Sequence, residues 1–183
     1  VKTVAPDCEV TITADAAVAE RAERIIFPGV GAIRDCMSEI LRLGFDQILT
    51  SAIAQKPVLG ICVGMQALMQ SSDENGGVSC LGLLPGAFHK FTAASDARGD
   101  RLKVPHMGWA ETWTNPGSQL PKGFEAALPQ DARFYYVHSF HLSCDRPDQA
   151  VLRAYHGYEF AAGVQRDNIL GGQFHPDKTQ RLG

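Results

Sequence analysis

The stretch Pro57-Val58-Leu59-Gly60-Ile61-Cys62-Val63-Gly64-Met65-Gln66 decides the fold of this chain. Its apolar first part predicts a buried strand, and the run that continues from Met65 predicts a helix. Gly60 and Gly64 flank Cys62 in a pattern typical of a nucleophile elbow, a turn that leaves room for little besides glycine. At the start of a helix, free backbone N–H groups favour a thiolate and can hold an oxyanion. The alternative is that Cys62 packs as a small buried hydrophobe.

Strands and helices alternate on the N-terminal side of this turn. Ile33, Cys36, Met37, Ile40 and Leu41 recur at helical spacing, which predicts an amphipathic helix that Gly44 closes. The other elements predicted here are strands at Val10–Thr13, Arg24–Phe27 and before Cys62, and helices at Asp15–Arg24, with Asp15 as N-cap, and Gln47–Gln55. The turn Pro28-Gly29-Val30-Gly31 follows the second strand. This alternation indicates an α/β fold with a parallel, doubly wound sheet.

The second half of the chain has a different character, with short strand-like runs separated by turn residues. The predicted strands are Phe88–Phe91, Arg101–Val104, Glu111–Thr114, Phe134–Val137, Ala150–Tyr155, Glu159–Gln165 and Asn168–Phe174. Arg166-Asp167-Asn168 is predicted to join the last two as a hairpin. We therefore expect residues 1–183 to form one α/β domain with a mixed sheet that includes antiparallel parts.

Composition excludes several classes of function. The net charge of −3 and the absence of any Lys/Arg cluster argue against a nucleic-acid partner. No apolar run is long enough to span a membrane and no secretory signal opens the chain, so we expect a cytoplasmic protein without a membrane partner. The five cysteines are scattered without metal-ligand spacing, which indicates neither a disulfide framework nor a metal site.

A second chemical segment lies near the end of the chain, at Gly171-Gly172-Gln173-Phe174-His175-Pro176-Asp177-Lys178. An apolar strand delivers a histidine, and a carboxylate follows two residues later. Residues i and i+2 of an extended segment share a face, so Asp177 can lie beside His175 and fix its tautomer. Cys62, His175 and Asp177 would then supply a nucleophile, a base and an orienting group.

These two segments resemble the signatures of the class I (triad) glutamine amidotransferases. Three further segments resemble, within that family, the glutaminase subunits of imidazole glycerol phosphate synthases: Phe27-Pro28-Gly29-Val30-Gly31-Ala32, Val104-Pro105-His106-Met107-Gly108-Trp109 and Phe134-Tyr135-Tyr136-Val137-His138-Ser139-Phe140. The resemblance covers essentially the whole chain. It implies a flavodoxin-like three-layer α/β fold with a mixed, mostly parallel central sheet and additional antiparallel strands.

The resemblance also implies a reaction, the hydrolysis of glutamine to glutamate and ammonia through a thioester on Cys62, with His175 as base and Asp177 as its orienting partner. The backbone N–H groups of Val63 and of the Val30-Gly31 turn are the candidates for an oxyanion hole. L-glutamine would be held by Gln66, by Glu74 and by the backbone of Ser139 and Phe140, whereas Tyr135 and Lys178 resemble residues at the mouth through which ammonia leaves.

Each of these roles has a plainer alternative. The glycines of the Pro28–Gly31 turn can be turn punctuation, Glu74 a solvated loop charge and Lys178 a surface charge. His106, His138 and Trp109 are better interpreted as residues that specify the fold near the site.

The implied partner is the (β/α)₈-barrel cyclase subunit, which uses the ammonia to make imidazole glycerol phosphate and an aminoimidazole carboxamide ribotide in histidine biosynthesis. No cofactor and no metal are implied. Two departures stand out: an aspartate occupies the position of the usual triad glutamate, and the family's first strand and C-terminal helix have no counterpart here. The alternatives are another class I amidotransferase glutaminase and a catalytically impaired binding subunit.

Overall fold

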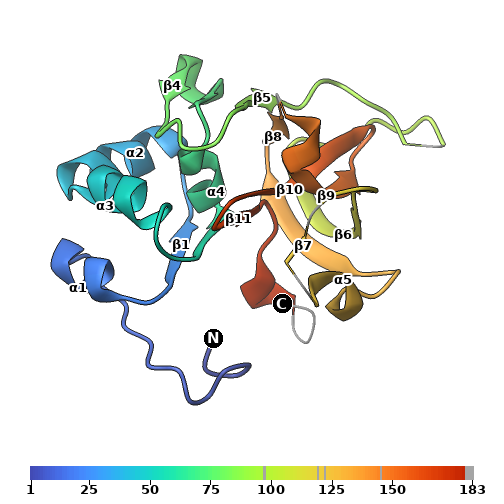
Figure 1. The fold of residues 1–183 in the computed structure, drawn as a ribbon. Helices are drawn as coiled ribbons and strands as arrows, with labels where there is room; N and C mark the ends of the chain where they lie inside the picture. The colour runs from blue at the N-terminus through green and yellow to red at the C-terminus, as the bar shows by residue number, and fades with distance from the viewer. Residues whose placement is uncertain (97, 119, 122, 145, 180–183) are drawn as a thin grey trace.

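The computed structural model of the chain describes residues 1–96, 98–118, 120–121, 123–144 and 146–179 (Figure 1). Its α-helices are α1 (Ala16–Arg21), α2 (Ile33–Arg42), α3 (Phe45–Ala52), α4 (Val63–Leu68) and α5 (Phe124–Ala127). Its strands are β1 (Ile25–Gly29), β2 (Val58–Cys62), β3 (Ser71–Ser72), β4 (Val78–Ser79), β5 (Ala87–Lys90), β6 (His106–Thr114), β7 (Arg133–His138), β8 (Phe140–Ser143), β9 (Ala150–Tyr155), β10 (Glu159–Arg166) and β11 (Ile169–Gly172). Short 3₁₀ turns are η1 (Glu74–Gly76), η2 (Pro147–Gln149) and η3 (Pro176–Lys178).

The strands form one mixed, strongly curled sheet. Its main order is β1-β2-β11-β10-β8-β5-β3-β4. Three strands branch from this order: β9 pairs with β10, β6 pairs with β9, and β7 pairs with β6. Figure 1 shows the consequence: α1 to α4 gather on one side of the molecule, and the curled antiparallel strands β6, β7 and β9 lie on the other. The predicted mixed sheet is confirmed, but its parallel share is smaller than expected. Parallel pairing joins β1 to β2, β2 to β11 and β3 to β5, and the other pairs are antiparallel.

The parallel part brings three distant segments to one edge. Gly29 pairs with Cys62 across β1 and β2, and Ile61 pairs with Gly172 across β2 and β11. The carboxyl ends of the three strands therefore meet at one place. In open α/β sheets this edge is where ligands bind.

The helices beside β1 confirm the amphipathic pattern read from the sequence. Ile33, Met37 and Ile40 of α2 are buried, and their cluster shares Phe27 with the cluster that holds Leu49 of α3. The helices α2, α3 and α4 thus all pack against the Phe27 side of β1. Ile26 points to the opposite side and remains 45% exposed, so that side of β1 is only partly covered in the described structure.

Two predicted strands are wrong. Val10–Thr13 has no strand conformation, and Ile12 is 99% exposed, because no described strand lies beside the segment to pair with it. Arg101–Val104 makes a single bridge, from Arg101 to Ser95, where a strand was expected. Three strands, β3, β4 and β8, were not predicted. The short β3 and β4 pair with each other, and β8, which follows β7, pairs with β5 and β10.

Other boundaries differ by a few residues. The helix predicted at Asp15–Arg24 ends at Arg21, with Asp15 as its N-cap as expected, and α3 begins at Phe45. The β10–β11 hairpin is confirmed: Arg166 pairs with Ile169, and Asp167 turns the chain with a φ of 50°.

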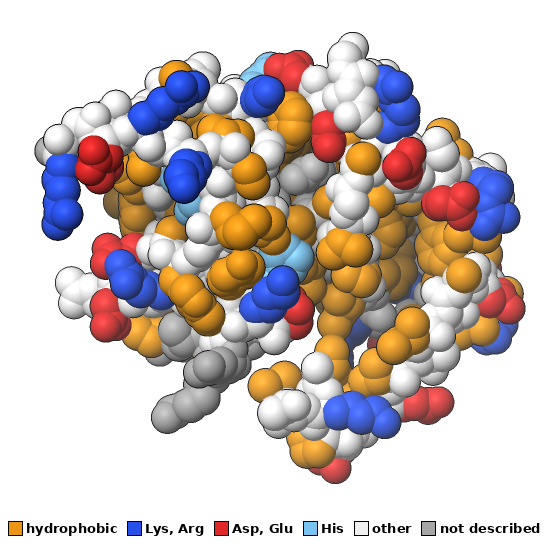
Figure 2. Space-filling view, turned by 180° about the vertical axis from the view of Figure 1, so that it is seen from behind, with side chains coloured by type: hydrophobic (Ala, Val, Ile, Leu, Met, Phe, Trp, Pro, Cys, Tyr) orange, Lys and Arg blue, Asp and Glu red, His pale blue; other side chains and the backbone are white. Residues whose placement is uncertain are grey.

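From behind, the N-terminal segment that precedes α1 stands off from the body of the molecule, leaving an open hollow with hydrophobic side chains along its border (Figure 2). No helix in the described part of the chain is long and apolar enough to cross a membrane.

Candidate active site

The elbow predicted at Cys62 has the expected backbone geometry. Cys62 is the last residue of β2, has φ 53° and ψ −114°, and directly precedes α4. A positive φ is unfavourable for a residue with a side chain and is typical of functional positions held in place by their surroundings. The structure therefore maintains a strained turn at the one cysteine that the sequence marks as a nucleophile.

The glycines on each side of Cys62 are required by close packing. A Cβ atom on Gly60 would lie 3.0 Å from the Cα atom of Met65, and one on Gly64 would overlap the carbonyl oxygen of Phe27 in β1. The turn at Gly29 is equally tight, because a Cβ there would lie 2.8 Å from the backbone nitrogen of Gly64. Glycines that served only to form a turn would not need such contacts. Here the absence of side chains lets β1, β2 and α4 pack closely around Cys62.

The Cys62 thiol is buried, with 5% of the residue exposed. Burial raises the pKa of the thiol to about 11, although hydrogen bonds from the Val63 backbone and from Gln173 act in the opposite direction. Asp177 and Cys36 raise this pKa further. The start of a short helix was expected to favour the thiolate; here burial outweighs it, and the thiol is protonated at neutral pH.

Two buried glutamines form a chain that ends at the sulfur. The Nε2 group of Gln66 donates to Oε1 of Gln173 at 3.2 Å, and Nε2 of Gln173 donates to Sγ of Cys62 at 3.6 Å. Gln66 was predicted as a substrate contact, whereas Gln173 was assigned no role. The available signal was the spacing in Gln173-Phe174-His175, since residues two apart on an extended segment lie on the same side.

His175 and Asp177 lie together. The His175 residue is 6% exposed, and its backbone N–H donates to the carbonyl of Tyr135 at 2.9 Å. Its Nδ1 atom lies 3.5 Å from Oδ1 of Asp177, whose side chain is 69% exposed. Among the described residues, the buried Nε2 atom of His175 has no hydrogen-bond partner. An imidazole with a carboxylate near Nδ1 and with Nε2 unoccupied is suited to take a proton from a neighbouring group.

The Val30-Gly31 turn and Glu74 also come together, at the start of α2. The Sγ–H group of Cys36 donates to the Val30 carbonyl at 3.4 Å, and Gly31 has a φ of 97°. The carboxylate of Glu74 accepts from the backbone N–H of Ile33 at 3.3 Å. Glu74 is half-buried and binds a helix N-terminus, where a negative charge is favourable, so it is not simply a solvated loop charge.

Comparison with known proteins identifies the family. A family model described as glutamine amidotransferase class-I matches residues 1–183. The chain belongs to the class-I glutamine amidotransferases. It is 45% identical over 175 residues to the imidazole glycerol phosphate synthase subunit HisH of Pseudomonas putida, covering 96% of this chain and 81% of that protein. The HisH subunit of Pseudomonas syringae is 47% identical over 174 residues, with 95% and 80% of the two chains covered.

Solved structures agree on the fold of this amidotransferase. One crystal structure of a glutamine amidotransferase matches with a TM-score of 0.65 at 15% identity, covering 98% of this chain and 84% of that one. Another, from Thermotoga maritima, matches with a TM-score of 0.55 at 17% identity, covering 85% and 56% of the two chains. The class I amidotransferase fold expected from the sequence is confirmed.

The Ser139-Phe140 backbone of the amidotransferase is tied to a buried pair of histidines. The Ser139 carbonyl accepts from the N–H of Phe91 at 3.0 Å, and the Phe140 carbonyl accepts from Nδ1 of His138 at 2.8 Å. Nε2 of His138 lies 3.0 Å from Nδ1 of His106. Burial lowers the pKa of His106 to about 4 and that of His138 to about 3, so both rings are neutral and serve the fold.

Tyr135 and Lys178 of the amidotransferase are neighbours. The Nζ atom of Lys178 lies 5.1 Å from the centroid of the Tyr135 ring, a cation–π arrangement. Trp109 packs edge-on against the same ring at 5.8 Å and is 49% exposed. Trp109 on β6, Tyr135 on β7 and Lys178 in the turn Pro176–Lys178 thus place an aromatic pair and a cation beside His175.

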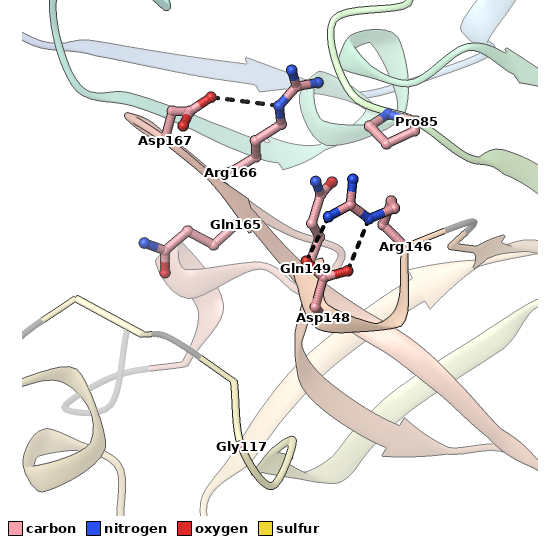
Figure 3. A pocket seen from close by; sticks show the side chains of 8 residues that line it. All are labelled: Pro85, Gly117, Arg146, Asp148, Gln149, Gln165, Arg166 and Asp167. Carbon is pink, nitrogen blue, oxygen red and sulfur yellow. Dashed lines mark hydrogen bonds and ion pairs between the residues drawn. The ribbon is translucent and has the colours of Figure 1, made fainter.

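A separate surface hollow of about 780 Å³ lies away from these residues (Figure 3). Its charged side chains are paired locally: Arg146 with Asp148 at 3.0 Å and Arg166 with Asp167 at 3.4 Å. The lining residues are Pro85, Gly117, Arg146, Asp148, Gln149, Gln165, Arg166 and Asp167, and they include none of the predicted site residues. The described residues contain no group of three or more His, Cys, Asp or Glu able to hold a metal ion.

Proposed function

We propose that this chain is the glutaminase subunit of an imidazole glycerol phosphate synthase, hydrolysing glutamine to glutamate and ammonia. The observation that carries the proposal is the strained turn at Cys62, whose sulfur is in contact with Gln173. His175 lies two residues after Gln173 on the same segment. The HisH relatives support the assignment to this synthase. We also propose that residues 1–183 act as one glutaminase domain, in the cytoplasm.

The proposed reaction has two halves. Nε2 of His175 takes the proton of the Cys62 thiol, and the sulfur attacks the carboxamide carbon of glutamine. The tetrahedral intermediate collapses to a thioester as His175 protonates the departing ammonia. Water, deprotonated by His175, then attacks the thioester and releases glutamate and the thiol. Asp177 orients the ring from Nδ1, at the 3.5 Å separation described above.

The surroundings of Cys62 provide the remaining roles. The backbone N–H of Val63, already directed at the sulfur, and an N–H of the Val30-Gly31 turn would hold the oxyanion. Gln66 and the Ser139-Phe140 backbone would hold the substrate. Glu74 would bind its α-ammonium group, and since its carboxylate also accepts from Ile33 N–H, this role requires the second oxygen.

The high pKa of Cys62 supports a glutaminase whose activity depends on a bound partner subunit. A thiol with a pKa of about 11 and a His175 Nε2 atom without a partner fit a glutaminase that is nearly silent alone. We propose that a (β/α)₈-barrel cyclase subunit binds beside Tyr135 and Lys178, activates the site and receives the ammonia. The same two observations are also what an impaired binding subunit would show, which makes it the second candidate.

Glutaminase activity with and without the barrel subunit separates the two candidates. We expect glutamate release to rise strongly when the barrel subunit and its ligand are present, and Cys62→Ala to abolish it. A glutamine-analogue electrophile should label Cys62 alone. No release under any condition would support the impaired subunit, and labelling of Cys36 or Cys80 would contradict the proposed nucleophile.

A further inference from the structure

Gln173 is a buried polar residue at the end of β11 that the proposed mechanism does not use. Its exposed fraction is 0%, and its backbone N–H donates to the carbonyl of Ala162 in β10 at 2.9 Å. Burying a carboxamide is costly unless its polar atoms find partners. The partners of Gln173 are therefore informative about why it is there.

The side chain of Gln173 has a partner at each end. Its Oε1 atom accepts from Gln66 Nε2 at 3.2 Å, and its Nε2 atom lies 3.6 Å from Cys62 Sγ. Because Gln66 presents a donor, Gln173 turns its oxygen to Gln66 and its N–H to the sulfur. The Gln173 amide thus directs an N–H donor at the Cys62 sulfur. A thiolate needs such a donor, whereas a thiol does not.

Few groups near Cys62 can stabilise negative charge. The Val63 backbone N–H and the Gln173 amide favour the thiolate, while burial, Asp177 of η3 and Cys36 of α2 oppose it. The deprotonated sulfur is a required intermediate of the proposed reaction, and in a buried site it depends on hydrogen-bond donors.

We propose that Gln173 is a further catalytic residue: its side-chain N–H hydrogen-bonds the Cys62 sulfur and stabilises the thiolate, and Gln66 holds the amide in that orientation. This inference rests on the proposed role of Cys62 as nucleophile. It gives Gln66 a second task, because the residue expected to contact the substrate also fixes the group that supports the thiolate.

The competing explanation is that the two amides only satisfy each other in the core. Both explanations predict some loss of stability when Gln173 is replaced. Only the proposed role predicts that the thiolate itself becomes less accessible, so the test follows the ionisation and reactivity of Cys62 without substrate.

The experiment measures alkylation of Cys62 by iodoacetamide from about pH 7 to about pH 10, with the modified peptide quantified by mass spectrometry. We compare the wild-type chain, Gln173→Met, which keeps the volume but removes the donor, and Gln173→Glu, which puts a carboxylate beside the sulfur. Gln55→Glu, on the exposed turn after α3, is the matched control. Each protein is measured alone and with the barrel subunit.

We expect Gln173→Met to be alkylated about tenfold more slowly than wild type at each pH, Gln173→Glu more slowly still, and Gln55→Glu at the wild-type rate. The thiolate ultraviolet absorbance, taken relative to Cys62→Ser, should fall in parallel, which a change of reagent access would not produce. Equal rates and equal absorbance in folded Gln173→Met would overturn the proposal.

Two further outcomes are informative. If Gln173→Met does not fold, Gln66→Met is measured instead, because it leaves the Gln173 amide in place but removes the residue that orients it. The same parallel loss of alkylation rate and thiolate absorbance is expected. Unchanged ionisation of Cys62 in Gln66→Met would overturn the proposal.

Alkylation of Cys62 does not require turnover of glutamine, so it also separates this proposal from the proposed function. A wild-type protein that releases no glutamate with any barrel subunit, while Gln173→Met slows alkylation, would refute the glutaminase function and retain the Gln173–Cys62 contact.

Discussion

The backbone of Gly64 lies directly against the carbonyl group of Phe27, so closely that a Cβ atom at Gly64 would overlap the carbonyl oxygen. This contact joins the helix that follows Cys62 to the strand that carries the Pro28–Gly31 turn. We expect Gly64→Ala to lower the free energy of unfolding by about 3 kcal/mol, since a packed core has no room for the methyl group. Urea unfolding measures the loss.

Gly76→Ala is the control for this prediction. Gly76 has a φ of 81° and open space around it, so alanine there costs backbone strain alone, about 1 kcal/mol. Equal losses in the two variants would mean that the contact with Phe27 is not what requires glycine at position 64.

Stability should fall in alkaline solution because of Cys62. Its pKa in the folded protein is raised from the ordinary value of 9.0 to about 11, so the folded state retains the proton that the unfolded state releases. The stabilisation is complete below about pH 9 and is lost as the pH rises through about 11, a total of about 2 to 3 kcal/mol.

Urea unfolding of wild type and Cys62→Ser at about pH 7, 9 and 10.5 checks this sign. The serine variant should lose less stability across the series. Cys80, whose pKa burial also raises to about 11, stays in both proteins and contributes equally. Parallel losses would show that Cys62 is not buried as described.

The effect of Asp177 on catalysis should depend on its negative charge and on the length of its side chain. With its oxygen 3.5 Å from His175 Nδ1 and its side chain 69% exposed, it orients the ring only loosely. We expect Asp177→Asn to lower kcat for glutamine about tenfold in the complex and Asp177→Glu to raise it above wild type. Steady-state glutamate release decides, and unchanged rates in both variants would remove Asp177 from the mechanism.

Glu74 is predicted to act in two separable ways. Its hydrogen bond to Ile33 N–H caps α2, so Glu74→Ala should cost about 1 kcal/mol of stability, and Glu74→Gln less, because the amide oxygen still accepts. If the charge also binds the substrate ammonium, both variants raise KM for glutamine. A KM unchanged in Glu74→Gln would leave only the capping role.

Trp109 offers a test of the proposed docking side. It is 49% exposed beside Tyr135, and exposed aromatic side chains often carry binding energy. We expect Trp109→Ala to weaken binding of the barrel subunit by about 2 kcal/mol in calorimetry. Tyr155→Ala, an aromatic 52% exposed at the end of β9, should have no effect, and equal effects would place the interface elsewhere.

The sequence by itself determined the local features that depend on neighbouring residues. The strand-turn-helix at Cys62, the amphipathic α2 and the hairpin at Asp167 follow from periodicity and turn chemistry, and each is present. The fold class and the family also follow from the motifs. Val10–Thr13 shows where such inference fails, because β-branched residues form a strand only beside a partner.

The tertiary structure decided everything that depends on segments meeting in space. Strand register places Gly29, Cys62 and Gly172 at one edge and brings Gln173 to the sulfur, a contact that no local pattern encodes. Burial outweighs the helix start and raises the pKa of Cys62, because desolvation depends on the whole fold. The sequence predicted Cys62 as the nucleophile; the protonation state of its thiol and its hydrogen-bond donor are set by long-range packing.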